Sequence, residues 1–114
     1  MDDREFQIKV VRQKKEWLME RSQIVSILNQ YKQNNSAKYG IKRLGIFGSA
    51  ARRSATPQSD IDIVVELQKQ DLFTLIGIKQ DLEEQIGTRV DIVSYRKNMN
   101  LFLKRRIDQE AVYA

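Results

Sequence analysis

The sequence contains neither cysteine nor histidine. Without cysteine there is no disulfide, no thiolate nucleophile and no cysteine-based zinc site, as is typical of proteins from a reducing compartment. Without histidine, the side chain that most often acts as a general acid or base near neutral pH is missing. Any proton transfer at a functional site must therefore depend on carboxylates and on a bound metal ion.

Proline and long apolar runs are also scarce. The 114 residues include one proline, and no apolar run approaches the roughly 20 residues that span a bilayer. Residues 1–5 are acidic and of mixed charge, unlike a signal peptide. Since 41% of the residues are hydrophobic, the chain has enough apolar surface for one core. We therefore expect a cytoplasmic protein with a single globular domain and no membrane partner.

Positive charge is in moderate excess, with 20 lysines and arginines against 15 acids and a net charge of +5. Such a balance favours polyanionic partners such as nucleotides, nucleic acid or an acidic protein. Much of the excess lies at residues 12–15 and 104–106. We interpret both clusters as solvated helix faces. We expect no nucleic-acid partner, although binding by these clusters stays open as the weaker alternative.

Two aspartates, Asp60 and Asp62, begin an apolar run at residues 60–67. In a strand, side chains alternate between faces, so both carboxylates should point one way while Ile61 and Ile63 point into the core. Neighbouring carboxylates on a partly buried strand repel each other, and a divalent cation relieves that repulsion. Oxygen ligands of this kind suit Mg²⁺ or Mn²⁺, with triphosphate oxygens completing the coordination shell.

A glycine–serine turn, Gly48 and Ser49, follows a predicted strand at 41–47. Glycine allows the backbone to approach a phosphate closely, and residues from Ala50 onward can begin a short helix with free amide donors. Arg52 lies in the first turn of that helix, where an arginine opposes the helix dipole unless an anion is bound. The turn therefore predicts a phosphate-binding site.

A third acid, Asp91, lies on a predicted strand at 89–94. Asp91 should face away from the apolar Val90 and Ile92. Alternatively, Asp91 only pairs with a neighbouring arginine. Taken one at a time, an Asp-x-Asp pair and a Gly-Ser pair are usually ordinary strand ends and loops. Their combination with Asp91 downstream is what favours a functional site.

Three helices are expected around these strands. Ser22 is the predicted cap of the first, which should end in the polar run 33–36. Asp71 and Gly87 are the predicted start and stop of the second, and Asn98 the predicted cap of the third. The apolar residues predicted to be buried on the first two helices are Ile24, Ile27, Leu28 and Tyr31, and Leu72, Leu75, Ile78, Leu82 and Ile86; the third helix is expected to carry Met99, Phe102, Leu103 and Ile107.

The order Gly-Ser, ten residues, Asp-x-Asp resembles the signature of the nucleotidyltransferase superfamily that includes DNA polymerase beta. The flanking residues, 44–47 before the turn and 63–66 within the second strand, resemble those of minimal nucleotidyltransferase (MNT) domains. The likeness spans residues 22–114, which leaves residues 1–21 as an N-terminal extension expected to be helical. It implies an α/β (α+β) nucleotidyltransferase fold, with a small mixed sheet of about three to four strands flanked by helices.

The resemblance also implies roles for individual residues. Asp60, Asp62 and Asp91 would be catalytic acids that hold two Mg²⁺ ions, with Mn²⁺ as an alternative, and Asp91 would favour deprotonation of the attacking hydroxyl. Displacement at the α-phosphate of ATP would then release pyrophosphate. The residues expected to bind the nucleotide are Gly48, Ser49, Arg52 and Ser59.

Many MNT proteins are paired with a HEPN ribonuclease toxin. The resemblance implies an antitoxin that transfers AMP from ATP to a tyrosine of that toxin and assembles with it as a hetero-oligomer. One alternative is a catalytically silent antitoxin that neutralises its toxin by binding alone. Another is a small-molecule nucleotidyltransferase, but such enzymes generally carry an acceptor-binding domain for which this chain is too short.

Overall fold

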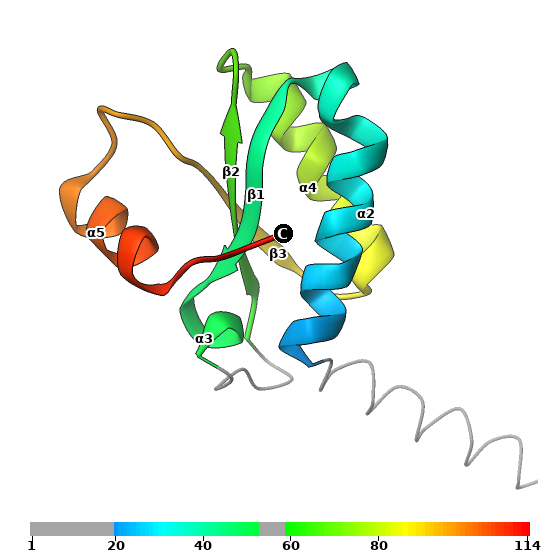
Figure 1. The fold of residues 1–114 in the computed structure, drawn as a ribbon, viewed down its shortest axis with the longest axis horizontal. Helices are drawn as coiled ribbons and strands as arrows, with labels where there is room; N and C mark the ends of the chain where they lie inside the picture. Colours follow the sequence, from blue (N-terminus) through cyan, green and yellow to red (C-terminus); the bar gives the residue numbers. More distant parts are fainter. Residues whose placement is uncertain (1–19, 53–58) are drawn as a thin grey trace, which may run out of the picture.

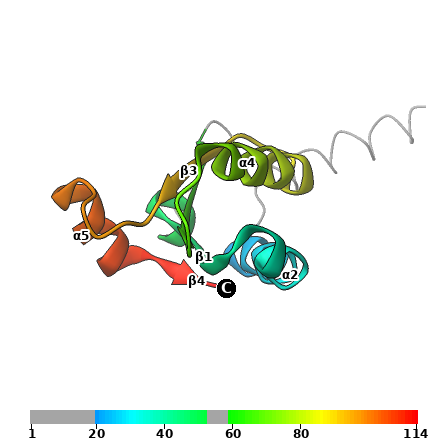
Figure 2. The ribbon, with the colours of Figure 1, turned by 90° about the horizontal axis from the view of Figure 1, so that it is seen from above.

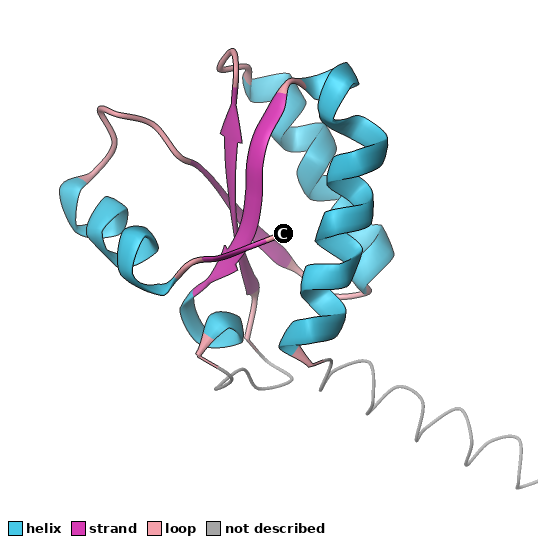
Figure 3. Cartoon of the chain, in the orientation of Figure 1, coloured by secondary structure: helices cyan, strands magenta, loops and turns pink. Residues whose placement is uncertain are grey.

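A mixed four-stranded sheet lies at the centre of the protein, with helices on both of its faces (Figures 1 and 3). The computed structural model describes residues 20–52 and 59–114, so the expected helical extension lies almost wholly outside the described residues. Viewed from above, α2 and α4 cover one face of the sheet and α5 lies on the other (Figure 2). The predicted small mixed sheet flanked by helices is confirmed.

The helices and strands follow the predicted order. Their bounds are α2 (Arg21–Tyr39), β1 (Ile41–Phe47), α3 (Gly48–Ala51), β2 (Ile61–Leu67), α4 (Leu72–Ile86), β3 (Val90–Ser94), α5 (Leu101–Glu110) and β4 (Val112–Tyr113). The strand order across the sheet is β3-β2-β1-β4. β1 pairs antiparallel with β2 and β4, whereas β2 and β3 are parallel. No helix within the described ranges combines the length and the apolar character that a membrane crossing requires.

Helix α2 differs from the prediction at both ends. Its N-cap is Glu20 rather than Ser22, and the backbone N–H of Glu20 donates to the side chain of Gln23 at 2.9 Å. This capping box satisfies backbone N–H groups at the start of the helix, so the helix begins before Ser22. The helix also continues through the polar run 33–36, of which residues 33 and 34 are exposed and residues 35 and 36 half-buried, and it ends at Gly40 in the left-handed conformation.

Helix α4 begins and ends as predicted. The Asp71 carboxylate accepts a hydrogen bond from the backbone N–H of Phe73 at 2.9 Å, and Gly87 ends the helix in the left-handed conformation. The predicted burial of Leu72 is wrong, because 68% of its surface is exposed. Leu72 is the first residue of the helix and lies beyond the edge of the core. The buried residues of α4 occur only further along the helix.

Helix α5 begins two residues later than predicted. Asn100, not Asn98, accepts the capping hydrogen bond from the backbone N–H of Leu103 at 3.1 Å. Of the apolar residues that this helix carries, Phe102 is 81% exposed, whereas Ile107 is fully buried. The face that α5 turns toward the sheet therefore includes Ile107 and Leu103 but not Phe102.

The sheet separates two apolar clusters. The larger lies between the sheet and helices α2 and α4, and it includes Leu28, Ile46, Ile63 and Leu82. The smaller lies under α5 and is built from Phe47, Val64, Ile107 and partly buried neighbours. Because strand side chains alternate, the residues next to Ile63 in β2 point toward α5. The α5 face is therefore the face onto which polar side chains of β2 project.

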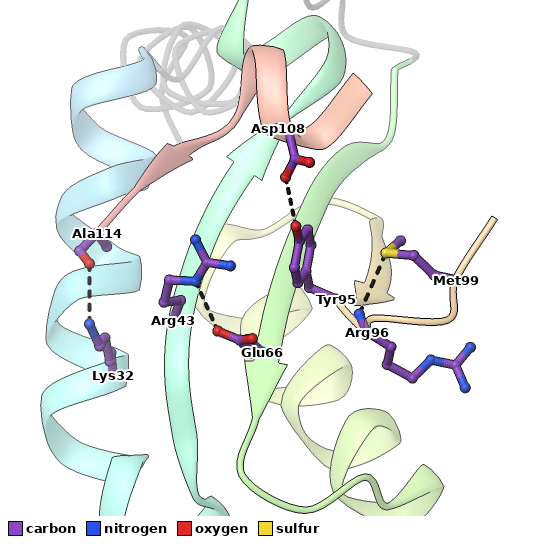
Figure 4. A network of polar contacts seen from close by, with 8 residues as sticks. All are labelled: Lys32, Arg43, Glu66, Tyr95, Arg96, Met99, Asp108 and Ala114. Atoms are coloured by element: carbon purple, nitrogen blue, oxygen red, sulfur yellow. Dashed lines mark hydrogen bonds and ion pairs between the residues drawn. The ribbon is translucent and has the colours of Figure 1, made fainter. Parts of the chain in front are cut away.

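Polar contacts fix α5 and the C-terminal segment against this face (Figure 4). The Tyr95 hydroxyl, just beyond β3, donates to the Asp108 carboxylate of α5 at 2.8 Å. The Arg43 guanidinium pairs with Glu66 at 2.9 Å and lies over the rings of Tyr95 and Tyr113. The Tyr95 hydroxyl thus ties α5 to the end of β3, and Arg43 in β1 contacts the Tyr113 ring of the C-terminal strand.

Candidate active site

Three strand ends meet at one end of the sheet, beside α3 (Figure 1). β1 ends there at Phe47, β2 starts there in the opposite direction, and β3 starts there parallel to β2. The glycine–serine turn and the predicted acids of β2 and β3 all belong to these ends. Topology alone therefore brings together residues that are far apart in the sequence.

Asp62 and Asp91 are direct neighbours across β2 and β3, where they form a register pair. Paired residues on adjacent strands project from the same face of a sheet. Asp62 lies two residues before Val64, which packs under α5, so both carboxylates belong to the α5 face. Asp62 is half-buried and Asp91 is exposed. The structure thus brings together two of the three predicted metal ligands.

The surroundings of Asp62 disfavour its charge. Burial is the largest cause that raises the pKa of the Asp62 carboxyl, followed by the nearby charge of Asp91 and, more weakly, that of Asp60. Arg106 and Arg52 act in the opposite direction and lower the pKa. The balance leaves the pKa above its ordinary value, as expected for a partly buried carboxyl with acidic neighbours. A bound cation would relieve this cost.

The third acid, Asp60, is exposed and lies just before β2. Its carboxylate is 3.7 Å from the guanidinium of Arg89, so the arginine expected to compete for Asp91 pairs with Asp60 instead. As the side chains are placed, no group of three acidic side chains within residues 20–52 and 59–114 is close enough to hold a metal ion. Completing the predicted triad would require Asp60 to turn away from Arg89.

Gly48 forms the tight turn at the end of β1. Its backbone φ of +68° lies in the left-handed region, which residues other than glycine rarely adopt. A Cβ atom at this position would collide with the Asp62 carboxylate and come within 3.2 Å of Arg106 Nη2. Ser49 follows Gly48 in α3 and Ser59 precedes Asp60, and both are half-buried. The turn therefore lies directly against Asp62.

A cluster of opposite charges surrounds the turn. The Glu110 carboxylate accepts a hydrogen bond from the backbone N–H of Gly48 at 3.2 Å through Oε2. Its Oε1 pairs with Arg52 at 2.9 Å, and Oε2 lies 3.6 Å from Nε of Arg106. The groups predicted to bind phosphate, Gly48 N–H and Arg52, thus hold the carboxylate of Glu110.

Sequence reasoning missed Arg106 and Glu110 at this site. Residues 104–106 are interpreted from the sequence as a solvated helix face, and Arg105 and Arg106 are exposed. The Arg106 guanidinium nevertheless also lies beside Asp62 and Gly48. The only signal in the sequence was the spacing of Arg106 and Glu110, which places them on neighbouring positions of one helix face. That spacing is too common on helix surfaces to indicate a site by itself.

Comparisons with known proteins bear on the family and the fold of the chain. The family model "Polymerase beta, Nucleotidyltransferase" matches residues 22–113. Protein adenylyltransferase MntA of Thermococcus cleftensis is 32% identical over 92 residues, which are 80% of this chain and 92% of that protein. A Methanocaldococcus jannaschii protein, provisionally named a protein adenylyltransferase, is 45% identical over 76 residues, 66% of this chain and 81% of that protein.

Solved structures share the fold. One described as a minimal nucleotidyltransferase has a TM-score of 0.67 and 29% identity, and the match covers 82% of this chain and 95% of that chain. A toxin–antitoxin crystal structure with AMP-PNP has a TM-score of 0.63, 20% identity and coverage of 75% and 69%. A Shewanella oneidensis MNT antitoxin in complex with a tri-AMPylated HEPN toxin has a TM-score of 0.50, 20% identity and coverage of 74% and 69%. At such identities the last two likenesses concern the fold alone.

Proposed function

Because the chain belongs to the polymerase beta nucleotidyltransferase family, we propose that it is an antitoxin that transfers AMP from ATP to a tyrosine of a HEPN ribonuclease toxin. The family membership makes the chain a nucleotidyltransferase. The finer assignment is supported by the name of its MntA relative, a protein adenylyltransferase. It is further supported by the fold shared with toxin–antitoxin complexes, one of which contains an AMPylated HEPN toxin.

The observation that carries this proposal is the Asp62–Asp91 pair beside the Gly48 turn. Two neighbouring carboxylates, of which Asp62 is half-buried and disfavoured in its charged form, make a donor set that suits Mg²⁺ or Mn²⁺. Asp62 and Asp91, with Asp60 turned away from Arg89, would hold two such ions. When bound, these ions would stabilise negative charge on the attacking and leaving oxygens.

The turn would hold the triphosphate. The backbone N–H of Gly48 and the guanidinium of Arg52 bind the Glu110 carboxylate, so they already donate hydrogen bonds to an anion. A phosphate oxygen would replace the Glu110 carboxylate as the acceptor of these hydrogen bonds, and Ser49 and Ser59 would add contacts on either side. Charge-assisted hydrogen bonds of this kind are among the strongest in proteins. Such binding would direct the α-phosphate toward the acids of β2 and β3.

The transfer itself exchanges a phosphoanhydride bond of ATP for a phosphoester bond to tyrosine. The tyrosine oxygen of the toxin forms a bond to the α-phosphorus, and the bond from that phosphorus to the β-phosphate oxygen breaks, so that pyrophosphate leaves. The phenolic proton passes to the Asp91 carboxylate and then to solvent, since the chain has no histidine to accept it. Asp91 is exposed and therefore open to an incoming acceptor.

The test is transfer of label from ATP to the toxin encoded beside this protein. Purified protein, Mg²⁺ and α-labelled ATP are incubated with that toxin, and the labelled residue is located by mass spectrometry. We expect a labelled tyrosine, and a loss of about 100-fold or more in Asp62→Asn. Asp71→Asn, which alters a helix cap at the other end of β2 and keeps its capping ability, should transfer as well as the wild type. No labelled toxin, or equal transfer by Asp62→Asn, would reject the proposal.

Two internal ion pairs favour the alternative of a silent antitoxin. Asp60 is engaged by Arg89, and the phosphate donors are engaged by Glu110. If the chain neutralises its toxin by binding alone, cells that express the toxin should survive equally well with the wild type and with the Asp60→Ala, Asp62→Ala double variant. Loss of protection in the double variant, at equal protein level and unchanged toxin binding, would exclude this alternative.

A further inference from the structure

Arg106 reaches the acidic end of the sheet from a different element than Arg52. It lies in the last turns of α5, whereas Arg52 follows α3. Its Nη2 atom lies within 3.2 Å of the point where a Cβ on Gly48 would be, and the same point is crowded by the Asp62 carboxylate. The end of the guanidinium is therefore directed at the turn that would hold phosphate.

Its neighbours hold this guanidinium in place. The Nε atom lies 3.6 Å from Glu110, and the guanidinium carbon lies 5.8 Å from the centre of the Phe47 ring. Both contacts involve the base and the face of the guanidinium, so its outer nitrogens are directed toward Gly48. An arginine fixed in this way loses little further rotational freedom when it binds an anion.

The charges around Arg106 do not call for an arginine on stability grounds alone. Its partner Glu110 already pairs with Arg52 at 2.9 Å. The Arg106–Glu110 contact is longer, and about half of the Arg106 side chain is exposed. An exposed pair of this type stabilises a protein by roughly 0–1 kcal/mol. The location beside Asp62 and Gly48 therefore requires another explanation.

We propose that Arg106 is a second triphosphate-binding arginine, which Glu110 and the Phe47 ring position across the Gly48 turn from Arg52. The two arginines would hold the triphosphate from both sides, with the backbone N–H of Gly48 between them. This inference rests on the proposed function only in requiring a nucleoside triphosphate as ligand. It does not depend on which protein receives the AMP.

The test measures binding of ATP in the presence of Mg²⁺ by calorimetry, with the full chain. Arg106→Gln should weaken ATP binding about tenfold or more, because a charge-assisted hydrogen bond is lost. Arg106→Lys should recover part of the loss by restoring the charge without the fork of donors. Arg105→Gln changes an exposed arginine next to Arg106 in the sequence and should bind ATP within about twofold of the wild type.

Binding of Mn²⁺ without nucleotide separates this role from a structural one. Removing a positive charge beside Asp62 should leave Mn²⁺ binding equal or tighter. The affinity for nucleotide should therefore fall while the affinity for metal does not. A parallel loss of both, with a lower melting temperature, would show that Arg106 only supports the fold and would overturn the inference. Equal ATP binding by Arg106→Gln and the wild type would also overturn it.

The inference and the proposed function fail in different ways. If the wild type binds ATP but labels no toxin, the proposed function fails while the binding data still decide the role of Arg106. If Arg106→Gln binds ATP normally and the wild type labels the toxin, the inference alone fails. If the wild type binds no ATP, both are overturned.

Discussion

Asp62 and Asp91 face each other across the parallel strands β2 and β3, with the half-buried Asp62 bearing most of the cost of this contact. Neither strand needs this pair of negative charges in order to fold. The larger part of the free-energy cost comes from burial of a charge and the smaller part from its acidic neighbours. Both parts depend on pH and on bound cations, so both can be measured.

Acid should reduce the destabilisation caused by Asp62. Its pKa is raised in the folded state, so the native protein holds a proton that the unfolded chain has already lost, and the free energy of unfolding falls as pH rises through that interval. Asp62→Asn should therefore be more stable than the wild type at neutral pH. The difference should shrink below the ordinary aspartate pKa, as measured by urea unfolding across a pH series. A difference that is constant with pH would contradict this explanation.

Divalent cations should stabilise the wild type. A ligand present at 100 times its dissociation constant adds about 2.7 kcal/mol to the free energy of unfolding, which corresponds to a rise of several degrees in melting temperature. Thermal unfolding with and without Mg²⁺ measures this rise. It should be absent in Asp62→Asn and Asp91→Asn and should be retained in Asp71→Asn. An equal rise in all four proteins would indicate a metal effect elsewhere.

Gly48→Ala should abolish nucleotide binding. The variant combines an unfavourable backbone conformation at φ +68° with a collision against the Asp62 carboxylate, and such strain costs about 1–3 kcal/mol. Gly87→Ala is the matched control, since Gly87 has a φ of +86° and no heavy atom within 4 Å of an added Cβ. Both variants should lose stability by urea unfolding, but only Gly48→Ala should lose ATP binding by calorimetry. Loss of binding in both would mean that instability alone is responsible.

Tyr31→Phe should affect stability and not the site. The Tyr31 hydroxyl donates to Asp81 at 2.7 Å and joins α2 to α4 on the far face of the sheet, so its loss should cost about 1 kcal/mol. Burial, with the Asp81 contact, raises the pKa of Tyr31 above its ordinary value of 10.0. The wild type should therefore lose stability as pH rises through about 10, where the unfolded chain releases this proton first. Tyr31→Phe should lose less over that range, and its ATP affinity should match that of the wild type.

The sequence predicted those parts of the site that depend on local geometry. Alternation along a strand placed Ile63 in the core and Asp62 on the opposite face, and a helix stop followed from Gly87. The parallel pairing of β2 and β3 then aligned Asp62 with Asp91. Predicting the strand alternation and the helix stop needed only the period of a strand and the conformational preference of one glycine.

Other features depended on how distant segments dock. The exposure of Leu72 and Phe102 reflects where the core ends, which helical periodicity does not specify. Arg106 and Glu110 reach the site because Tyr95 ties α5 to the sheet through Asp108. A residue pattern within α5 carries no information about such docking, so the basic cluster at 104–106 resembled an ordinary solvated surface.

The hydrogen bond between Gly48 and Glu110 joins residues 62 positions apart in the chain. Closing so long a loop is entropically costly and tends to come late in folding. A chain emerging from the ribosome would therefore present the acids of β2 and β3 well before α5 arrives to complete the opposite side of the turn. Newly made molecules would gain their full hold on nucleotide only after α5 has been made and has docked on the sheet.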